Sequence, residues 1–273
     1  MSKPAQNPMN ETTPGDGHRP LAYKNEAFLD SPSARSLRIL SEYLEPHSHL
    51  QRQRIQDTVV FFGSARVEEG GPMGGYYDDA RTLARLMTEW SMKLPGPNHR
   101  FVVCSGGGPG IMEAANRGAA DAGGKTVGLN IGLPFEQRPN PYITPELSFE
   151  FHYFFMRKFW FAYMAKALVV FPGGFGTLDE MSEILTLAQT HKLQKKISIV
   201  LYGSSYWKEV LNFPALVKYG MIAQADMELF QYADSPQSAL RILQDKLTEH
   251  HLRPEAGKPE REAPTPEIAK SVV

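Results

Sequence analysis

The sequence has few of the features that mark disulfide-rich, zinc-stabilised, membrane or nucleic-acid-binding proteins. Its single cysteine, Cys104, excludes an internal disulfide, and no cysteine and histidine residues follow the spacing of a zinc site. The formal net charge is −1, from 29 basic and 30 acidic side chains, so no positive excess favours nucleic acid or an anionic membrane. The most apolar run, 159–171, is interrupted by Lys166 and is too short to span a bilayer.

The amino terminus also lacks the apolar core of a signal peptide. Together with the single cysteine, this indicates a reducing compartment, and we expect a cytoplasmic protein. Hydrophobic residues make up 42% of the chain, which is enough for a sizeable core.

The two ends of the chain differ in composition from the part between them. Residues 1–30 and 251–273 are rich in proline and charge. They hold too few apolar side chains to offset the entropy of ordering, so we predict disordered tails. Residues 31–57 contain leucines at helical spacing and predict a helical extension. Residues 58–250 are predicted to form one domain.

Short β-branched and apolar runs alternate with amphipathic stretches from Thr58 onward. This alternation predicts a three-layer α/β fold, in which a mainly parallel sheet lies between helices. We expect strands within 58–66, 101–110, 126–132, 147–154, 167–174 and 197–203. We expect helices at 78–93, 111–122, 155–166, 178–191, 206–218 and 236–248.

Glycine or small residues follow three of the predicted strands, at 63–65, 106–110 and 173–177. Ligands bind beyond the carboxyl ends of strands in open α/β sheets, and glycine lets backbone N–H groups approach a phosphate at the start of a helix. A phosphorylated ligand is one interpretation, and tight turns without a ligand are the other. Neither a Walker A sequence nor a dinucleotide fingerprint with its acidic ribose anchor is present.

Two interpretations of Glu180 stay open. Thr177 and Glu180 have the T-x-x-E spacing of a capping box, in which the carboxylate binds a backbone N–H at the helix start. Alternatively, a carboxylate one turn into a helix and beside a phosphate loop is placed to stabilise a cationic transition state or to activate water. Asp179 is a weaker candidate for the same role.

The basic pair Arg157-Lys158 lies within the aromatic segment 151–163. The two cations either extend to solvent at the edge of a helix or serve a partly buried anionic site. Arg157 is the better functional candidate, because its rigid and permanently charged fork suits a carboxylate or a phosphate.

With these residues in view, the sequence resembles the Lonely Guy (LOG) family of nucleotide phosphoribohydrolases, which have long been labelled possible lysine decarboxylases. The resemblance rests on the PGG-x-GT-x-x-E motif at 172–180, the Arg157-Lys158 pair before it, and the GGG-x-G segment at 106–110 followed by Ile-Met-Glu. It covers about 58–248, so the chain is similar to a longer bacterial subtype. The decarboxylase label lacks support in the sequence, because no Schiff-base lysine with its cofactor partners is recognisable.

The resemblance implies a modified Rossmann-like fold, a homodimer or higher homo-oligomer, and hydrolysis of the N-glycosidic bond of a purine nucleoside 5′-monophosphate. The substrate would be AMP or a cytokinin riboside 5′-monophosphate, the products the free base and ribose 5-phosphate, with no cofactor and no metal. Arg157 and Glu180 would be the catalytic pair. The further substrate-binding residues would be Gly63, Ser64, Gly107, Gly108, Gly110, Met156, Lys158, Gly173, Gly174, Gly176 and Thr177.

A non-catalytic nucleotide or cofactor carrier is the alternative function. Such a carrier needs glycine loops to hold its ligand, but it does not need the Arg157 and Glu180 pair. The presence of both residues therefore favours the enzyme.

Overall fold

The computed structural model describes residues 19–132, 138–193 and 195–253. Its chain divides into two compact units, Met1–Leu44 and Glu45–Val273. The described part of the first unit is helical. The side-chain oxygen of Asn25 caps one of its short helices by accepting a hydrogen bond from Phe28 N at 3.2 Å. Its elements are η1 (Ala22–Lys24), α1 (Glu26–Leu29), η2 (Pro32–Ala34) and the first part of α2 (Arg35–Arg52).

Seven parallel strands form the sheet of the second unit, in the order β4-β3-β2-β1-β5-β6-β7. The first four strands run in sequence from the central β1 outward to β4, and β5 to β7 then run outward on the other side of β1. The carboxyl ends of β1 and β5 therefore flank the position where open α/β sheets bind ligands. The strands are β1 (Thr58–Phe62), β2 (Val102–Ser105), β3 (Thr126–Ile131), β4 (Ser148–Phe151), β5 (Ala165–Val170), β6 (Ser198–Tyr202) and β7 (Phe230–Ala233).

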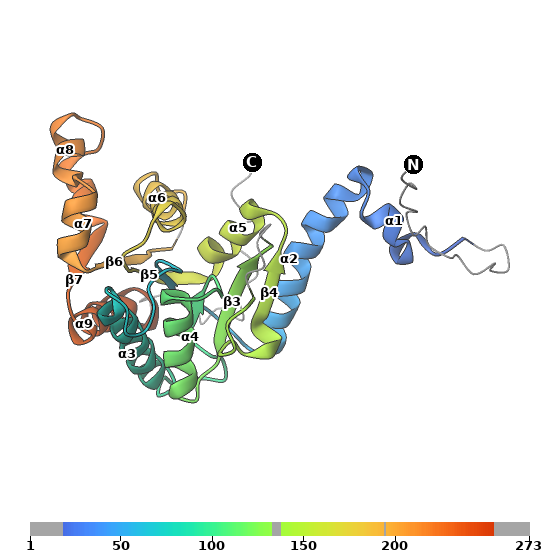
Figure 1. Cartoon of the computed structure of the whole chain (residues 1–273), viewed down its shortest axis with the longest axis horizontal. Coiled ribbons are helices and arrows are strands. Elements are labelled where there is room, and N and C mark those ends of the chain that lie inside the picture. The colour runs from blue at the N-terminus through green and yellow to red at the C-terminus, as the bar shows by residue number, and fades with distance from the viewer. Residues whose placement is uncertain (1–18, 133–137, 194, 254–273) are drawn as a thin grey trace, which may run out of the picture. The chain divides into compact units, whose positions relative to one another are not determined.

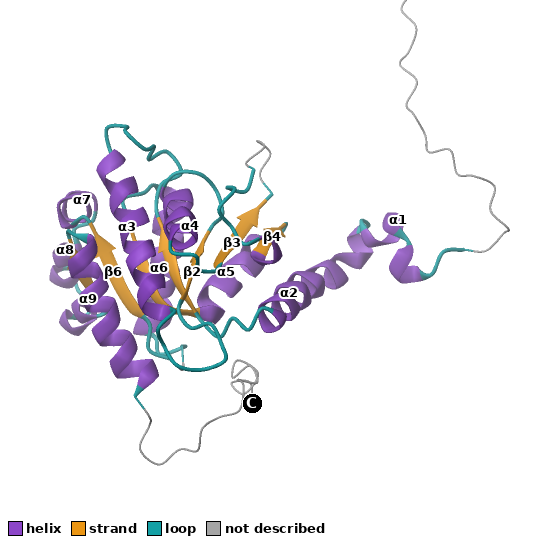
Figure 2. Cartoon of the chain, turned by 90° about the horizontal axis from the view of Figure 1, so that it is seen from below, coloured by secondary structure: helices purple, strands orange, loops and turns teal. Residues whose placement is uncertain are grey.

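Helices cover both faces of this sheet, as the views in Figures 1 and 2 show. On one face, α3, α4 and α9 pack over alternate strand residues such as Val59, Val103 and Val169, all of them fully buried. The other face carries α5 and α6, and Trp160 and Phe161 of α5 are buried there. The helices are α3 (Gly74–Ser91), α4 (Ile111–Asp121), α5 (Phe154–Met164), α6 (Phe175–Gln189), α7 (Ser204–Val210), α8 (Phe213–Lys218) and α9 (Pro236–Leu247), with η3 (Pro145–Leu147), η4 (Gln224–Glu228) and η5 (Thr248–Leu252).

The predicted three-layer α/β fold is confirmed, and the sheet is parallel throughout its described strands. Two details of the prediction were wrong. The strand β7 was missed, because only the first and last of its four residues are buried and it gives no continuous apolar run. The single helix predicted at 206–218 is two helices, α7 and α8, and the side chain of Asn212 caps the second.

Helical segments extend into both of the predicted tails. The segments η1 and α1 lie within residues 1–30, and η5 reaches Leu252. The rest of the predicted tails, 1–18 and 254–273, lies outside the described residues. Across the described ranges, no helix is both long and apolar enough to cross a bilayer.

Candidate functional site

Backbone hydrogen bonds join the three loops that follow β1, β2 and β5. Ser64 N donates to Pro172 O at 3.0 Å, and Ile111 N donates to Ser64 O at 3.1 Å. Glycine permits this approach: a Cβ on Gly63 would lie 2.6 Å from Ile111 Cγ2, and a Cβ on Gly110 would lie 2.4 Å from Ser64 O. The three glycine-bearing segments identified in the sequence therefore meet at the carboxyl edge of the sheet.

The loop after β2 is held by its own hydrogen bonds. Gly107 has φ +74°, and its N–H donates to Ser105 Oγ at 3.0 Å. The Asn140 side chain donates to Gly107 O at 3.0 Å and to Gly108 O at 3.1 Å. The N–H of Gly107 is thus engaged within the protein, so this residue shapes the loop.

The loop after β5 leads directly into α6, which begins at Phe175 with Gly174 as its N-cap and no capping side chain. A Cβ on Gly173 would lie 2.1 Å from Thr177 Oγ1, whereas nothing lies within 4 Å of a Cβ on Gly174 or Gly176. The N–H groups in the first turn of a helix have no intrahelical acceptor, and the open space beside these glycines leaves room for an anion to approach them.

The capping-box interpretation of Glu180 was wrong. Thr177 lies inside the first turn of α6 rather than at its N-cap, and the Glu180 carboxylate points to a different partner. Glu180 Oε1 accepts a hydrogen bond from Arg157 Nη2 at 3.2 Å. Only 7% of the Glu180 side chain and 15% of the Arg157 side chain are exposed, so α5 and α6 bring together a largely desolvated ion pair.

Burial acts on both members of this pair. It raises the pKa of Glu180 to about 7, although the positive charges of Arg157 and Lys158 oppose the shift. Burial also lowers the pKa of Arg157, against the opposing effect of Glu180. The Arg157 guanidinium lies over the rings of Phe154 and Phe161, at 5.2 and 5.7 Å from their centroids. Arg157 Nε is buried and has no hydrogen-bond partner among the described residues.

Lys158 has partners of its own. Its Nζ lies 2.7 Å from Asp179 Oδ2 and 3.2 Å from Glu183 Oε2. Burial lowers the pKa of Lys158, but these hydrogen bonds outweigh burial and the net shift of its pKa is upward. Asp179, the weaker candidate of the sequence analysis, is therefore paired with Lys158 rather than with Arg157.

Two further predicted residues and two aromatic residues that were not predicted differ widely in burial. Met156 is buried in α5, and Ser64 Oγ accepts a hydrogen bond from Arg66 N at 3.0 Å. Sequence analysis did not single out Phe175, whose exposed fraction is 92% at the start of α6, or Phe154, whose exposed fraction is 52%. Exposed aromatic side chains of this kind can mark a contact surface, and the sequence alone does not show that these two are exposed.

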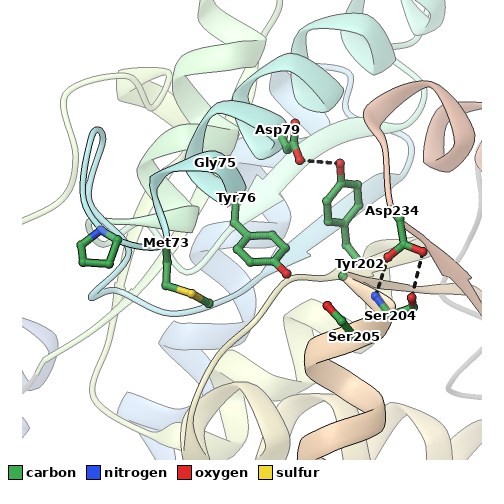
Figure 3. Close-up of a pocket in the computed structure, with 10 residues that line it drawn as sticks. Met73, Gly75, Tyr76, Asp79, Tyr202, Ser204, Ser205 and Asp234 are labelled. Atoms are coloured by element: carbon green, nitrogen blue, oxygen red, sulfur yellow. Dashed lines mark hydrogen bonds between the residues drawn. The ribbon is translucent and has the colours of Figure 1, made fainter.

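A pocket of about 520 Å³ with a mixed polar and apolar lining lies at the carboxyl ends of β6 and β7 (Figure 3). Tyr202 donates to Asp79 Oδ2 at 2.8 Å, and Asp234 accepts from both N and Oγ of Ser204. Neither Arg157 nor Glu180 lines the pocket. The sequence analysis assigned none of these pocket residues.

Fold and site together define a Rossmann-like α/β protein with an arginine–glutamate pair beside the glycine loops of its sheet. The family model described as possible lysine decarboxylase matches residues 112–243. The probable cytokinin riboside 5′-monophosphate phosphoribohydrolase LOGL3 of Oryza sativa subsp. japonica is 28% identical over 73% of this chain and 87% of its own length. The chain is thus similar to proteins of the Lonely Guy (LOG) family.

A second curated relative and a solved structure are also similar to this chain. The cytokinin riboside 5′-monophosphate phosphoribohydrolase LOG3 of Arabidopsis thaliana is 25% identical over 72% of this chain and 85% of its own length. Among solved structures, that of the structural genomics target TM1055 is similar, with a TM-score of 0.50 and 21% identity, covering 69% of this chain and 99% of that one. This structural similarity supports the α/β fold and nothing beyond it.

Proposed function

We propose that this protein hydrolyses the N-glycosidic bond of a purine nucleoside 5′-monophosphate, AMP or a cytokinin riboside 5′-monophosphate, to the free base and ribose 5-phosphate. The observation that carries the proposal is the buried pair of Arg157 and Glu180, 3.2 Å apart beside the glycine loops. The activity named for the plant relatives supports the same reaction class.

The glycine loop after β5 supports binding of the 5′-phosphate. Gly174 and Gly176 have open space where a side chain would stand, and they flank the start of α6. The helix N-terminus offers unpaired N–H donors and a favourable dipole to a phosphate. Phosphate binding there would place the ribose near Glu180, one turn further along the same helix.

Glu180 suits the chemistry of the bond cleavage. As the bond between ribose C1′ and the base nitrogen breaks, the nitrogen keeps the electron pair and takes up a proton, while positive charge develops on the ribose. An ionised Glu180 stabilises that charge and orients a water, whose hydroxide joins C1′. The proton of that water passes to the carboxylate and then to solvent, which balances the proton that the base nitrogen takes up from solvent. A pKa of about 7 lets Glu180 alternate between both protonation states near neutral pH.

Arg157 controls the charge of Glu180 and offers a further donor. Its positive charge favours the ionised carboxylate against the effect of burial. Its Nη2 is used by Glu180, and its buried Nε has no partner among the described residues. We assign Nε to a ribose hydroxyl or phosphate oxygen of the bound substrate, since a buried donor left unpaired is costly.

The decisive experiment measures base release from AMP and from isopentenyladenosine 5′-monophosphate by chromatography, with wild type and Glu180→Gln side by side. We expect the wild type to release the base and the variant to lose about 10² to 10⁴ of kcat, the usual contribution of a general acid–base group. Glutamine keeps the size of the side chain but carries no charge.

Asp179→Asn serves as the matched control, because Asp179 is a neighbouring carboxylate on α6 that pairs with Lys158. We expect its kcat to stay within a few-fold of the wild type. No base release from either nucleotide, with nucleotide binding retained, would reject hydrolysis and favour the carrier function. Equal loss in both variants would reject the specific role of Glu180.

A further inference from the structure

Helix α7 follows β6 and is attached to the end of the neighbouring strand β5. Trp207 of α7 is fully buried, and its Nε1 lies 3.1 Å from Val170 O at the end of β5. The same Nε1 lies 3.0 Å from Tyr202 O at the end of β6. One indole N–H thus ties α7 to the carboxyl ends of both strands, directly before the glycine loop that follows β5.

The start of α7 is held by a second set of contacts. Asp234, which follows β7, accepts hydrogen bonds from Ser204 N at 2.6 Å and from Ser204 Oγ at 2.8 Å (Figure 3). Gly203 has φ +85°, a backbone conformation that favours glycine, and its N–H donates to Ala233 O at 2.9 Å. The position of α7 is therefore fixed relative to β5, β6 and β7.

Tyr206, the residue before Trp207, contacts the glycine loop from this fixed helix. The side chain of Tyr206 is partly buried, and its hydroxyl donates a hydrogen bond to Gly173 O at 2.9 Å. Gly173 belongs to the PGG-x-GT-x-x-E motif, whereas Tyr206 lies in a different helix. A side chain of α7 therefore fixes one carbonyl group of the motif.

The direction of Gly173 O determines the direction of the next N–H group. The described residues contain no cis peptide bond, so the C=O of Gly173 and the N–H of Gly174 point in opposite directions across a planar trans peptide. Because Gly173 O points to Tyr206, the N–H of Gly174 points away from α7. This N–H has no acceptor among the described residues, and a Cβ on Gly174 would have no atom within 4 Å.

The hydrogen bond from Tyr206 also affects where α6 begins. The first backbone hydrogen bond of α6 runs from Leu178 N to Gly174 O, at 3.0 Å. One residue earlier, the helical donor would be Thr177 N and the acceptor Gly173 O, but these two atoms form no such bond in the described structure. Gly173 O is bonded to Tyr206 instead. The N–H of Thr177 is thereby left without a backbone acceptor.

We propose that Tyr206 is a positioning residue for the phosphate loop of the proposed site. Its hydroxyl holds Gly173 O outside α6, so that the N–H groups of Gly174 and Thr177 are free to bind the 5′-phosphate of the substrate. Without this hydroxyl, Gly173 O can accept from Thr177 N, which adds a residue to α6 and occupies one donor. The inference rests on the proposed function, because it requires that a phosphate binds at this loop.

The test compares Tyr206→Phe with the wild type, because this substitution removes the hydroxyl and keeps the ring. Titration calorimetry with ribose 5-phosphate measures phosphate binding without any base release. We expect Tyr206→Phe to weaken this binding about tenfold, the size of effect expected when a charged phosphate loses one hydrogen-bond donor. Adenosine, which carries no phosphate, should bind to both proteins equally.

Base release from AMP gives a second measurement. We expect KM of Tyr206→Phe to rise about tenfold while kcat stays within about twofold of the wild type, because the phosphate is bound alike in the ground state and the transition state. A fall in kcat at unchanged KM would overturn the assignment of Tyr206 to phosphate binding.

Tyr76→Phe is the matched control. The ring of Tyr76 lies against Gly203 before α7, but its hydroxyl forms no hydrogen bond within the described residues. We expect this variant to keep the affinity of the wild type for ribose 5-phosphate.

The binding and kinetic results separate this inference from the proposed function. Equal affinity of Tyr206→Phe and wild type for ribose 5-phosphate would overturn the role of Tyr206, even if the wild type releases the base. An equal loss of affinity for ribose 5-phosphate and adenosine would also overturn it, since the effect would not depend on the phosphate. Weaker ribose 5-phosphate binding by Tyr206→Phe, with no base release by the wild type, would reject hydrolysis and support the role of Tyr206.

Discussion

At each edge of the sheet a buried carboxylate faces an arginine, but the two pairs are built differently. At the amino edge, Asp57 accepts hydrogen bonds on both oxygens, from Arg100 at 2.8 Å and from Phe101 N at 2.6 Å. At the carboxyl edge, Glu180 accepts one bond from Arg157, at 3.2 Å. The exposed fractions of the two carboxylate side chains are similarly low, 1% and 7%.

This difference separates a structural carboxylate from one available for chemistry. Asp57 joins the loops before β1 and β2, and its satisfied oxygens leave little capacity for a ligand. Glu180 keeps one oxygen with spare capacity and a pKa of about 7, in a place where glycine loops leave open space. Burial and charge alone do not distinguish the pairs, whereas the number of hydrogen bonds does.

The comparison is tested most strongly by Asp57→Asn, the counterpart of Glu180→Gln at the other edge. Removing one partner of a buried ion pair costs about 3 to 5 kcal/mol, so we expect a loss of that size in the free energy of unfolding. We expect kcat of the proposed base release by the folded variant to change less than about twofold, since Asp57 and the glycine loops lie at opposite ends of the strands. Urea unfolding and base release measure the two quantities.

The reverse result would break the comparison. If Asp57→Asn kept its stability and lost kcat, the amino edge would belong to the catalytic machinery. Arg85→Gln is the control for a general loss of charge, because Arg85 pairs with Glu89 on the surface of α3. We expect its stability to change by less than about 1 kcal/mol.

We expect the unfolding free energy of the wild type and that of Glu180→Gln to depend differently on pH. Because the pKa of Glu180 is about 7 in the folded protein and near 4.5 otherwise, the folded state holds its proton to higher pH. The wild type therefore loses unfolding free energy as pH rises from about 4.5 to above 7, by about 3 kcal/mol at most. Glu180→Gln lacks this loss.

We accordingly expect the stability of Glu180→Gln relative to the wild type to increase between pH 5 and pH 8. The measurement is a series of urea unfolding curves across that range for both proteins. A difference that stays constant with pH would show that the carboxylate is ionised throughout, and would remove the basis for its role as a proton acceptor near neutral pH.

The glycines of the loop after β5 offer a smaller test. A Cβ on Gly173 would meet Thr177 Oγ1 at 2.1 Å, so we expect Gly173→Ala to lower the unfolding free energy by about 1 to 3 kcal/mol. A Cβ on Gly174 would have no atom within 4 Å, so we expect Gly174→Ala to keep the unfolding free energy of the wild type. If the substrate phosphate binds in this open space, the added methyl group should crowd it and raise KM. Equal KM values for Gly174→Ala and wild type would place the phosphate elsewhere.

Much of the fold could be predicted from the sequence because the parallel strands are short, apolar and buried. The apolar runs of β1 and β5 predict strands by local sequence alone. The glycine segments indicated which strand ends would lie close together. The edge strand β7 has only four residues and half-buried positions, so its place depends on pairing with β6 rather than on local sequence.

The contacts within the candidate site could not be predicted from the sequence, and the roles of its residues stay predictions. The T-x-x-E spacing of Thr177 and Glu180 fits a capping box and a functional carboxylate equally well, and only the position of α5 against α6 brings Arg157 to Glu180. The pair of Asp57 and Arg100 at the amino edge gave no local signal, because its two members precede separate strands and meet only in the folded sheet.

The smallest expected effect concerns Phe175, which lies at the carboxyl edge of the sheet and has an exposed fraction of 92%. An aromatic ring without packing partners contributes little to stability, so we expect Phe175→Ala to change the unfolding free energy by less than about 0.5 kcal/mol. If the ring contacts the base or ribose, KM should rise about fivefold, which corresponds to about 1 kcal/mol of aromatic contact. Tyr219→Ala, which truncates an aromatic side chain that is 70% exposed after α8, is the control and should keep KM. A KM equal in both variants would assign Phe175 to the surface and leave substrate contact at the carboxyl edge to the glycine loops and the Arg157 and Glu180 pair.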